Sequence, residues 1–434
     1  MHRKILLTFM GAFAVTACAD SATGPQADAR PIAANYGKVA AIGDFQRYVA
    51  IGTSISQGWR SDGVNAASQE TSWPAQLARL AGRELSLPLI AFPGCGAPLA
   101  APLASGLRVS GEATAAPFLS RICAPNEPGV TLPAGNVAIS GARTIHALTA
   151  TPEQPDPSYA PLYARVLPPG MSQVTAMEAQ NPKIVSVELG ANEILGAREG
   201  AYVPGQNVVP VAAWQPGYHE VVNRVAAATK HGVLVGLIEH AANFPSFRTG
   251  AELYAARATF APFNVSVSED CSVAPGNTNV LFVPVRVALI AAEGAARARA
   301  GLSAAVLSCA NAPPTGANGL IIRDYVLSQA ELAQVDAHFA AMNAIIRAEA
   351  EAHGFAYFAL STLYEGAITK APFSAITMLT SPQPYGPLVS LDGLHPSAEG
   401  STVLADAAAG ALADRYNMFF PNPGGAPLAM LLRQ

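Results

Sequence analysis

The chain has 434 residues, a formal net charge of −4 and only 13% charged residues. An acidic balance without a basic run argues against a nucleic acid as its partner. Beyond the N-terminal region, no apolar run reaches the roughly 18 residues that a membrane-spanning helix needs. The length suits one large domain with insertions, or two domains.

The N-terminus resembles an export signal. A basic start precedes an apolar run at Ile5–Val15, which is too short to span a bilayer. The following VTAC segment resembles a bacterial lipobox, whose cysteine becomes lipidated. We therefore expect a lipoprotein signal peptide at 1–17, lipid on Cys18 and a flexible tether at 18–43. The protein would then be exported and anchored, facing the periplasm or at the outer membrane or cell surface. An ordinary signal peptide with an incidental cysteine is the alternative.

Farther along the chain, apolar segments of strand length alternate with helical patterns. In chain order we expect a strand at 47–52, a helix at 72–82, a strand at 183–189, a helix at 220–231, a strand at 232–239, a helix at 328–354, a strand at 355–360 and a closing helix at 398–416. This alternation indicates an α/β sandwich around a mainly parallel sheet. Ligands bind such sheets beyond the carboxyl ends of the strands.

Three regions rich in Pro, Gly and Ala interrupt the alternation, near 93–135, 150–171 and 244–317. Long loops in a compact domain are often functional, so we expect these insertions to build the substrate cleft. The expected domain spans 44–416, and the tail at 417–434 has too little pattern to assign.

Four cysteines remain if Cys18 carries lipid, namely Cys95, Cys123, Cys271 and Cys309. None belongs to a C-x-x-C pair, which argues against a zinc site. An even number in an exported protein suggests disulfides. We expect Cys95–Cys123 and Cys271–Cys309, because each pair lies within one insertion. Buried free thiols are the alternative.

Two short motifs carry candidate catalytic groups. Ser54 follows the first expected strand, on a tight turn into a helix, where a hydroxyl projects above the sheet and backbone N–H groups can meet an oxyanion. In the DGLHP segment, Asp392 lies three residues before His395. One turn would let its carboxylate hold one ring nitrogen, leaving the other to take a proton from a serine. Taken separately, a helix-capping serine and a solvated histidine are the alternatives.

Two further motifs offer oxyanion donors. Asn192, in GANE, directly follows an expected strand and can donate its side-chain N–H, although an Asx turn would use the same residue. Gly141 ends the segment NVAISG, where the backbone N–H can approach a ligand closely.

Together these motifs resemble, in order and placement, the SGNH hydrolases, also called GDSL-like esterases and lipases. The Ser-Trp-Pro segment at 72–74 is also similar to that family. The resemblance implies a flavodoxin-like three-layer α/β/α sandwich with Ser54 as nucleophile and His395 with Asp392 as its base. The oxyanion would be held by Ser54, Gly141 and Asn192.

The chain departs from the family pattern at two positions. Thr53 stands where the family usually has Asp, which leaves the geometry of the nucleophile turn open, and Glu193 replaces another usual Asp. Gly94 rivals Gly141 as the glycine donor, although the residues before Gly141 match the family block better.

The resemblance implies a serine ester hydrolase that works through an acyl-enzyme, without a metal or organic cofactor. Its expected substrate is a small-molecule or lipid ester, and we expect a monomer. Two alternatives stay open: an acyltransferase or deacetylase acting on surface carbohydrate, and a binding lipoprotein that uses the fold without catalysis.

Overall fold

The computed structural model describes residues 39–272 and 279–421. These residues belong to one compact unit that begins at Lys38. The expected signal peptide, the lipidation site at Cys18 and most of the C-terminal tail lie outside the described residues.

A parallel sheet forms the centre of the fold. Its strands, in the order β10-β4-β3-β2, are β10 (Ala356–Ala359), β4 (His231–Gly236), β3 (Ile184–Glu188) and β2 (Tyr48–Gly52). Their side chains are almost continuously buried, as is typical of a parallel sheet covered on both faces. A further segment runs beside β2, where Val137 N–H donates to Ala50 O at 2.9 Å and Ile139 N–H to Gly52 O at 3.1 Å.

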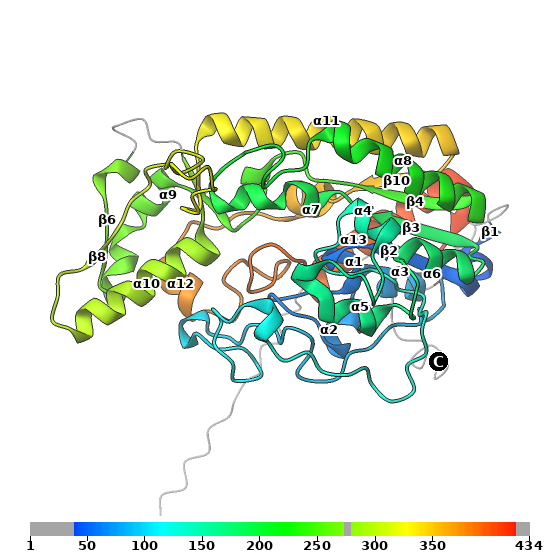
Figure 1. Ribbon diagram of the computed structural model, residues 1–434, viewed down its shortest axis with the longest axis horizontal. Coiled ribbons are helices and arrows are strands. Elements are labelled where there is room, and N and C mark those ends of the chain that lie inside the picture. Colours follow the sequence, from blue (N-terminus) through cyan, green and yellow to red (C-terminus); the bar gives the residue numbers. More distant parts are fainter. Residues whose placement is uncertain (1–38, 273–278, 422–434) are drawn as a thin grey trace, which may run out of the picture. The chain divides into compact units, whose positions relative to one another are not determined.

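Helices cover both faces of this sheet. On one face α11 (Gln329–His353) packs on β4 with α8 (Val211–Ala228) beside it, and on the other α13 (Ala398–Tyr416) packs on β10 with α3 (Trp73–Leu80) beside it (Figure 1). The expected α/β sandwich with a parallel sheet is therefore confirmed. The remaining α-helices are α1 (Ser54–Gln57), α2 (Ala66–Glu70), α4 (Thr144–Thr149), α5 (Ala160–Val166), α6 (Gln173–Ala179), α7 (Ala191–Ile194), α9 (Gly250–Ala255), α10 (Val283–Arg299) and α12 (Ala375–Thr380).

Helix α8 begins nine residues earlier than the predicted start at residue 220. It runs through Pro216, a residue that usually ends or kinks a helix. The early turns are held by tertiary packing, because Trp214 and Tyr218 are both buried and their rings lie 4.7 Å apart. Burial of this aromatic pair outweighs the unfavourable proline.

The third insertion contains much regular structure, in contrast to the loop expected there. Strands β5 (Phe247–Thr249) and β7 (Val280–Phe282) form an antiparallel sheet with β9 (Val326–Leu327), and β6 (Val265–Val267) pairs in parallel with β8 (Ala305–Leu307). Helix α10 occupies 17 residues of the insertion. Its many alanines have the highest helix propensity of any residue, which explains a helix without a clear amphipathic pattern.

Both expected disulfides are confirmed. Cys95 bonds Cys123 with a Cα–Cα distance of 3.7 Å, and Cys271 bonds Cys309 with a Cα–Cα distance of 5.0 Å. Each disulfide closes a loop within one insertion. Restricting the unfolded chain in this way stabilises a fold by about 3–4 kcal/mol per bond for loops of this length.

The folded domain extends beyond the expected bounds of 44 and 416. Strand β1 (Val39–Ala40) pairs in parallel with β11 (Met418–Phe419), and the rings of Phe45 and Phe420 lie 5.9 Å apart. The last residues of the expected tether and the first of the expected tail thus belong to the fold. A pairing of two residues is too short to leave a periodic pattern in a sequence.

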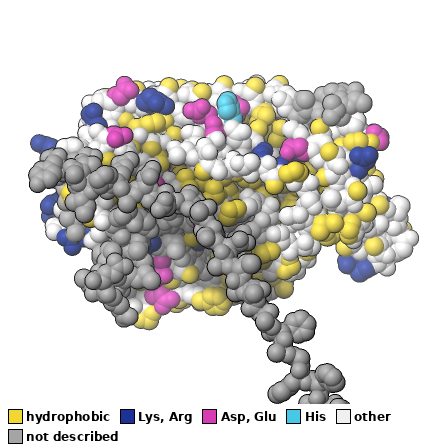
Figure 2. Space-filling model, turned by 180° about the vertical axis from the view of Figure 1, so that it is seen from behind, with side chains coloured by type: hydrophobic (Ala, Val, Ile, Leu, Met, Phe, Trp, Pro, Cys, Tyr) yellow, Lys and Arg dark blue, Asp and Glu magenta, His cyan; other side chains and the backbone are white. Residues whose placement is uncertain are grey.

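Charged residues make up only 13% of the chain. On the face shown in Figure 2, charged side chains of both signs are scattered among hydrophobic and uncharged ones. Among the described helices, none combines the length and the apolarity needed to cross a membrane.

Candidate active site

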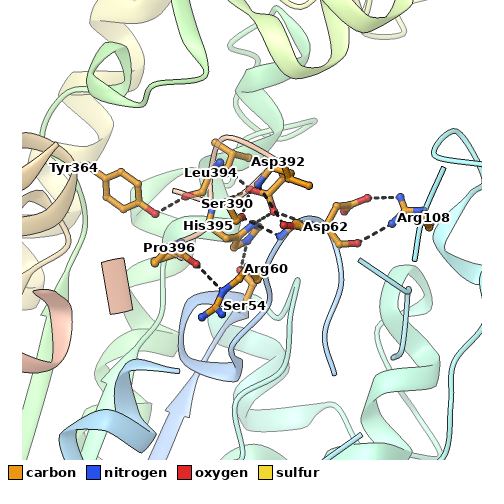
Figure 3. A network of polar contacts seen from close by, with 12 residues as sticks. Ser54, Arg60, Asp62, Arg108, Tyr364, Ser390, Asp392, Leu394, His395 and Pro396 are labelled. Atoms are coloured by element: carbon orange, nitrogen blue, oxygen red, sulfur yellow. Dashed lines mark hydrogen bonds and ion pairs between the residues drawn. The ribbon is translucent and has the colours of Figure 1, made fainter. Parts of the chain in front are cut away.

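Three residues from distant parts of the chain form a hydrogen-bonded triad. His395 Nε2 lies 2.9 Å from Ser54 Oγ, and His395 Nδ1 lies 2.9 Å from Asp392 Oδ2 (Figure 3). Ser54 is 7% exposed and Asp392 is 9% exposed, while His395 is partly buried. With the proton on Nδ1 directed to Asp392, Nε2 is left to accept the serine proton.

Ser54 lies at the first position of α1, and only Thr53 separates it from the end of β2. The short helix ends at Gly58, which has a left-handed φ of 87°, and Trp59 N–H then donates to Ser54 O at 2.9 Å. The first N–H groups of a helix have no partner within it. Accordingly, the Ser54 N–H has no acceptor among the described residues and is available to an oxyanion.

A tight turn aligns the other two members of the triad. Gly393 adopts a φ of +74°, its N–H donates to Ser390 O at 3.0 Å, and Ser390 N–H donates to His395 O at 2.9 Å. A Cβ at position 393 would lie 2.6 Å from Ser246 Cβ, in the third insertion. Glycine is thus required both by the backbone conformation and by the space, and the turn realises the three-residue offset between Asp392 and His395.

The Asp392 carboxylate is held by several donors. Oδ1 accepts hydrogen bonds from the N–H groups of Leu394 and His395, each at 2.9 Å, and from Ser390 Oγ at 3.1 Å. Burial opposes ionisation of Asp392, but its interactions with His395 and the Leu394 N–H outweigh burial and place its pKa well below the usual range. The acid therefore stays ionised and orients the imidazole.

Asp62 connects the first insertion to the triad. Its N–H donates to Asp392 Oδ2 at 2.7 Å, and its own Oδ2 lies 2.5 Å from Arg108 Nη2 (Figure 3). The same Oδ2 lies 2.9 Å from Arg121 Nη1. Arg108 is 2% exposed although charged, and its Nη1 also donates to Ala97 O at 2.8 Å. Asp62 could not be predicted from the sequence, because a single Asp eight residues after Ser54 forms no recognisable pattern.

The other two expected oxyanion donors follow the two segments that flank β2, and the hydrogen bond from Asn192 to Ala142 O brings them close together. Gly141 follows the segment beside β2, with a φ of +76°, and its N–H has no acceptor among the described residues. Asn192 lies in α7, just after β3, and donates one amide hydrogen to Ala142 O at 2.9 Å. The second hydrogen of that amide is left for a ligand.

The second insertion packs directly against Gly141. A Cβ at that position would lie 2.1 Å from the ring of Tyr159, so no larger residue fits without displacing the ring. Tyr159 belongs to an aromatic cluster, with its ring centroid 4.9 Å from that of Phe118 and 6.0 Å from that of Trp59. The rival glycine, Gly94, instead meets the backbone of Val64, 2.3 Å from an ideal Cβ, and serves the packing of the first insertion.

Two buried glutamates near the site have different partners. Glu193 Oε1 accepts the Thr144 N–H at 2.6 Å, and burial raises the pKa of Glu193. Glu188, which was not predicted from the sequence, accepts hydrogen bonds from Thr53 and Ser56, on either side of Ser54. An acid at the end of a mainly apolar strand was the available sign, since acidic residues are rarely buried without a partner.

Two groups of side chains among the described residues lie close enough together to share a metal ion. One is Asp270, Cys271 and Cys309, whose cysteines form a disulfide, and the other is Glu239, His240 and Glu365. Neither group includes a member of the triad.

Neither a protein-family model nor a curated protein sequence matches the chain. Solved structures with a related arrangement include the α/β hydrolase LAE5 from the Lake Arreo metagenome (14% identity, 84% of this chain and 94% of that chain covered, TM-score 0.33). A protein described as a GDSL-like lipase from Parabacteroides merdae (12% identity, 84% and 94% covered, TM-score 0.33) and an extracellular lipase from Streptomyces rimosus (15% identity, 83% and 98% covered, TM-score 0.29) are similar to the same degree. At these scores the similarity carries no functional weight.

Proposed function

We propose that this chain is a serine ester hydrolase of the SGNH type. The observation that carries the proposal is the hydrogen-bonded chain from Ser54 Oγ through both nitrogens of His395 to Asp392, with 2.9 Å at each step. A buried carboxylate, an oriented imidazole and a serine at the start of a helix are the groups that acyl transfer requires.

The reaction proceeds in two acyl-transfer steps. His395 Nε2 takes the Ser54 proton as Oγ attacks the ester carbonyl carbon, and the resulting imidazolium is stabilised by Asp392. Collapse of the tetrahedral intermediate breaks the bond to the alcohol oxygen, which receives the proton from His395. Water then repeats the sequence on the acyl-enzyme, releasing the carboxylic acid and restoring Ser54.

The oxyanion is stabilised by N–H groups that lack protein acceptors. The backbone N–H groups of Ser54 and Gly141 and the second amide hydrogen of Asn192 supply three such donors among the described residues. Donors fixed in place before the reaction act on the charge that develops in the transition state, which is the main source of rate acceleration in acyl transfer.

The test is hydrolysis of nitrophenyl esters of graded acyl length by the full chain and by Ser54→Ala. We expect kcat to fall by roughly 10⁴–10⁶-fold in the variant, which lacks the nucleophile but keeps the other groups. A phosphonate reagent should label Ser54 alone. Activity that survives in Ser54→Ala contradicts the proposal, while acyl transfer to added sugars or alcohols in preference to water identifies the transferase alternative.

A further inference from the structure

The last residue of β3 packs its side chain against the nucleophile turn. Glu188 is the strand partner of Gly52 and is completely buried. Its Oε2 accepts the N–H of Thr53 at 3.0 Å and the N–H of Ser56 at 3.2 Å. These two residues lie on either side of Ser54, so one carboxylate holds both ends of the turn.

Two hydroxyls complete the contacts of this carboxylate. Thr53 Oγ1 donates to Glu188 Oε1 at 2.8 Å, and Ser56 Oγ donates to Oε2 at 3.0 Å. The indole N–H of Trp73 donates to Ser56 Oγ at 3.1 Å, which directs the Ser56 hydroxyl hydrogen toward Glu188. Burial raises the pKa of Glu188, and the hydrogen bonds from Thr53 and Ser56 oppose that rise.

The N-terminus of α1 is not capped by the side chain of its own N-cap residue. Thr53 is the N-cap residue, but its side chain makes no capping hydrogen bond. In an ordinary capped helix the N-cap side chain accepts the N–H of the second or third helical residue. Here the third helical residue is Ser56, and its N–H is taken by Glu188 from the neighbouring strand. The cap of the nucleophile helix therefore comes from β3.

We propose that Glu188 is a positioning residue for the nucleophile: it caps α1 from the adjacent strand and fixes the turn that presents Ser54 to His395. This inference rests on the proposed role of Ser54. It also accounts for Thr53, which stands where the resembled family has Asp. An acid at position 53 could take the Ser56 N–H itself, whereas Thr53 donates its hydroxyl to Glu188.

The first test removes the acceptor and keeps the length of the side chain. Glu188→Met leaves the N–H groups of Thr53 and Ser56 without an acceptor, and we expect kcat to fall about 100-fold with KM within about twofold, because a small displacement of a reacting group has an effect of this size. Glu188→Gln, which keeps the shape and one acceptor, should fold even if Glu188→Met does not, and should lower kcat by roughly tenfold.

Glu331→Met is the matched control. Glu331 is also a buried carboxylate that caps a helix, since its Oε2 accepts the N–H of Ser328 at 2.9 Å and the hydroxyl of Ser328 at 2.7 Å at the start of α11. Its loss should lower Tm without changing kcat. A fall in kcat at position 188 no larger than that at position 331 overturns the proposal.

A rescue experiment separates positioning from general stability. Thr53→Asp alone brings two acids together in a buried place and should lower activity. Combined with Glu188→Met, the same substitution supplies an ordinary N-cap and should return kcat to within about tenfold of the wild-type value. A double variant no more active than the position-188 variant alone overturns the proposal.

Amide hydrogen exchange distinguishes failure of this proposal from failure of the proposed function. If wild type and Ser54→Ala hydrolyse esters equally, the proposed function is wrong, but the cap can still be measured. Faster exchange at Thr53 and Ser56 in Glu188→Met than in Glu331→Met supports the cap, and equal exchange in the two variants overturns it.

Discussion

The N–H of Asp62 donates to Asp392 Oδ2 at 2.7 Å, the same oxygen that holds His395 Nδ1 at 2.9 Å. Asp392 is thus fixed from two sides, by its own turn and by a residue eight positions after Ser54. Because two buried or half-buried arginines hold the Asp62 side chain, the first insertion controls where that N–H points.

Asp62→Asn tests this connection. Asparagine tolerates the left-handed backbone at this position, where φ is 57°, but loses the charge that pairs with Arg108 and Arg121. Weakening one hydrogen bond to a charged acceptor corresponds to about 1.5 kcal/mol, so we expect kcat to fall roughly tenfold with little change in KM. Steady-state kinetics on a nitrophenyl ester measure both constants, and an unchanged kcat would show that the insertion does not act on the acid.

Asp392→Asn should lower kcat by about 10⁴-fold, because an amide cannot hold the imidazole in the required tautomer. The depressed pKa of Asp392 also predicts a pH effect on stability. A carboxyl group with a folded pKa below its unfolded value of about 3.9 stabilises the fold above that pH, and the contribution is lost as the pH falls. The free energy of unfolding can be measured by chemical denaturation between about pH 6 and pH 3. As the pH decreases, it should therefore fall more for the wild type than for Asp392→Asn. A difference that does not vary with pH contradicts the assignment.

Asn192→Ala should lower kcat by about 10²–10³-fold with little change in KM, since an oxyanion donor acts mainly on the transition state. The variant also loses the hydrogen bond to Ala142 O, which holds the amide beside Gly141. Thermal unfolding measured alongside the kinetics shows how much of the effect is structural. A higher KM with an unchanged kcat would make Asn192 a residue for substrate binding.

Cys18 lies outside the described residues, and we propose from the sequence that it carries the lipid anchor. Cys18→Ser should release the protein from membranes without lowering ester hydrolysis in solution. Each buried methylene of an acyl chain contributes about 0.8 kcal/mol to membrane binding. Fractionation of cells with a high-salt wash, with esterase activity followed in each fraction, tests both parts. Retention of the variant in the membrane pellet would place the anchor elsewhere.

The members of the triad could be predicted because each lies in a local pattern: a serine directly after a strand, and an acid three residues before a histidine. The contacts of Glu188 and Asp62 with the site could not be predicted, because they join segments that are far apart in the sequence. Glu188 reaches Thr53 across 135 positions, and Asp62 reaches Asp392 across 330. A local pattern can mark Glu188 as an acid at the end of a buried strand, but it does not identify the distant residues that Glu188 contacts.

The fold shows the same division. Strands β3 and β4 were predictable because they are mainly apolar, as a buried parallel strand requires. The start of α8 could not be predicted, because Pro216 argues against a helix in the sequence. The helix forms there because the packing of Trp214 and Tyr218 stabilises it. Helix α10 in the third insertion forms because of the high helix propensity of its alanines. It was not predicted, because the helices were predicted from the periodic spacing of apolar residues.

The two disulfides offer a matched pair of variants for testing how the first insertion acts on the triad. They close loops of 28 and 38 residues, so their removal should destabilise the fold by similar amounts, about 3.5–4 kcal/mol each. Only Cys95–Cys123 lies in the segment that supplies Arg108 and Arg121 to Asp62. Replacing both cysteines of that pair by Ala should therefore lower kcat several-fold at temperatures where the protein stays folded, while the same change at Cys271 and Cys309 should lower Tm alone. Denaturant unfolding and steady-state kinetics of the two double variants give the comparison. Equal losses of kcat in both would show that the disulfides act through general stability, and that Asp62 keeps its place on Asp392 without support from the first insertion.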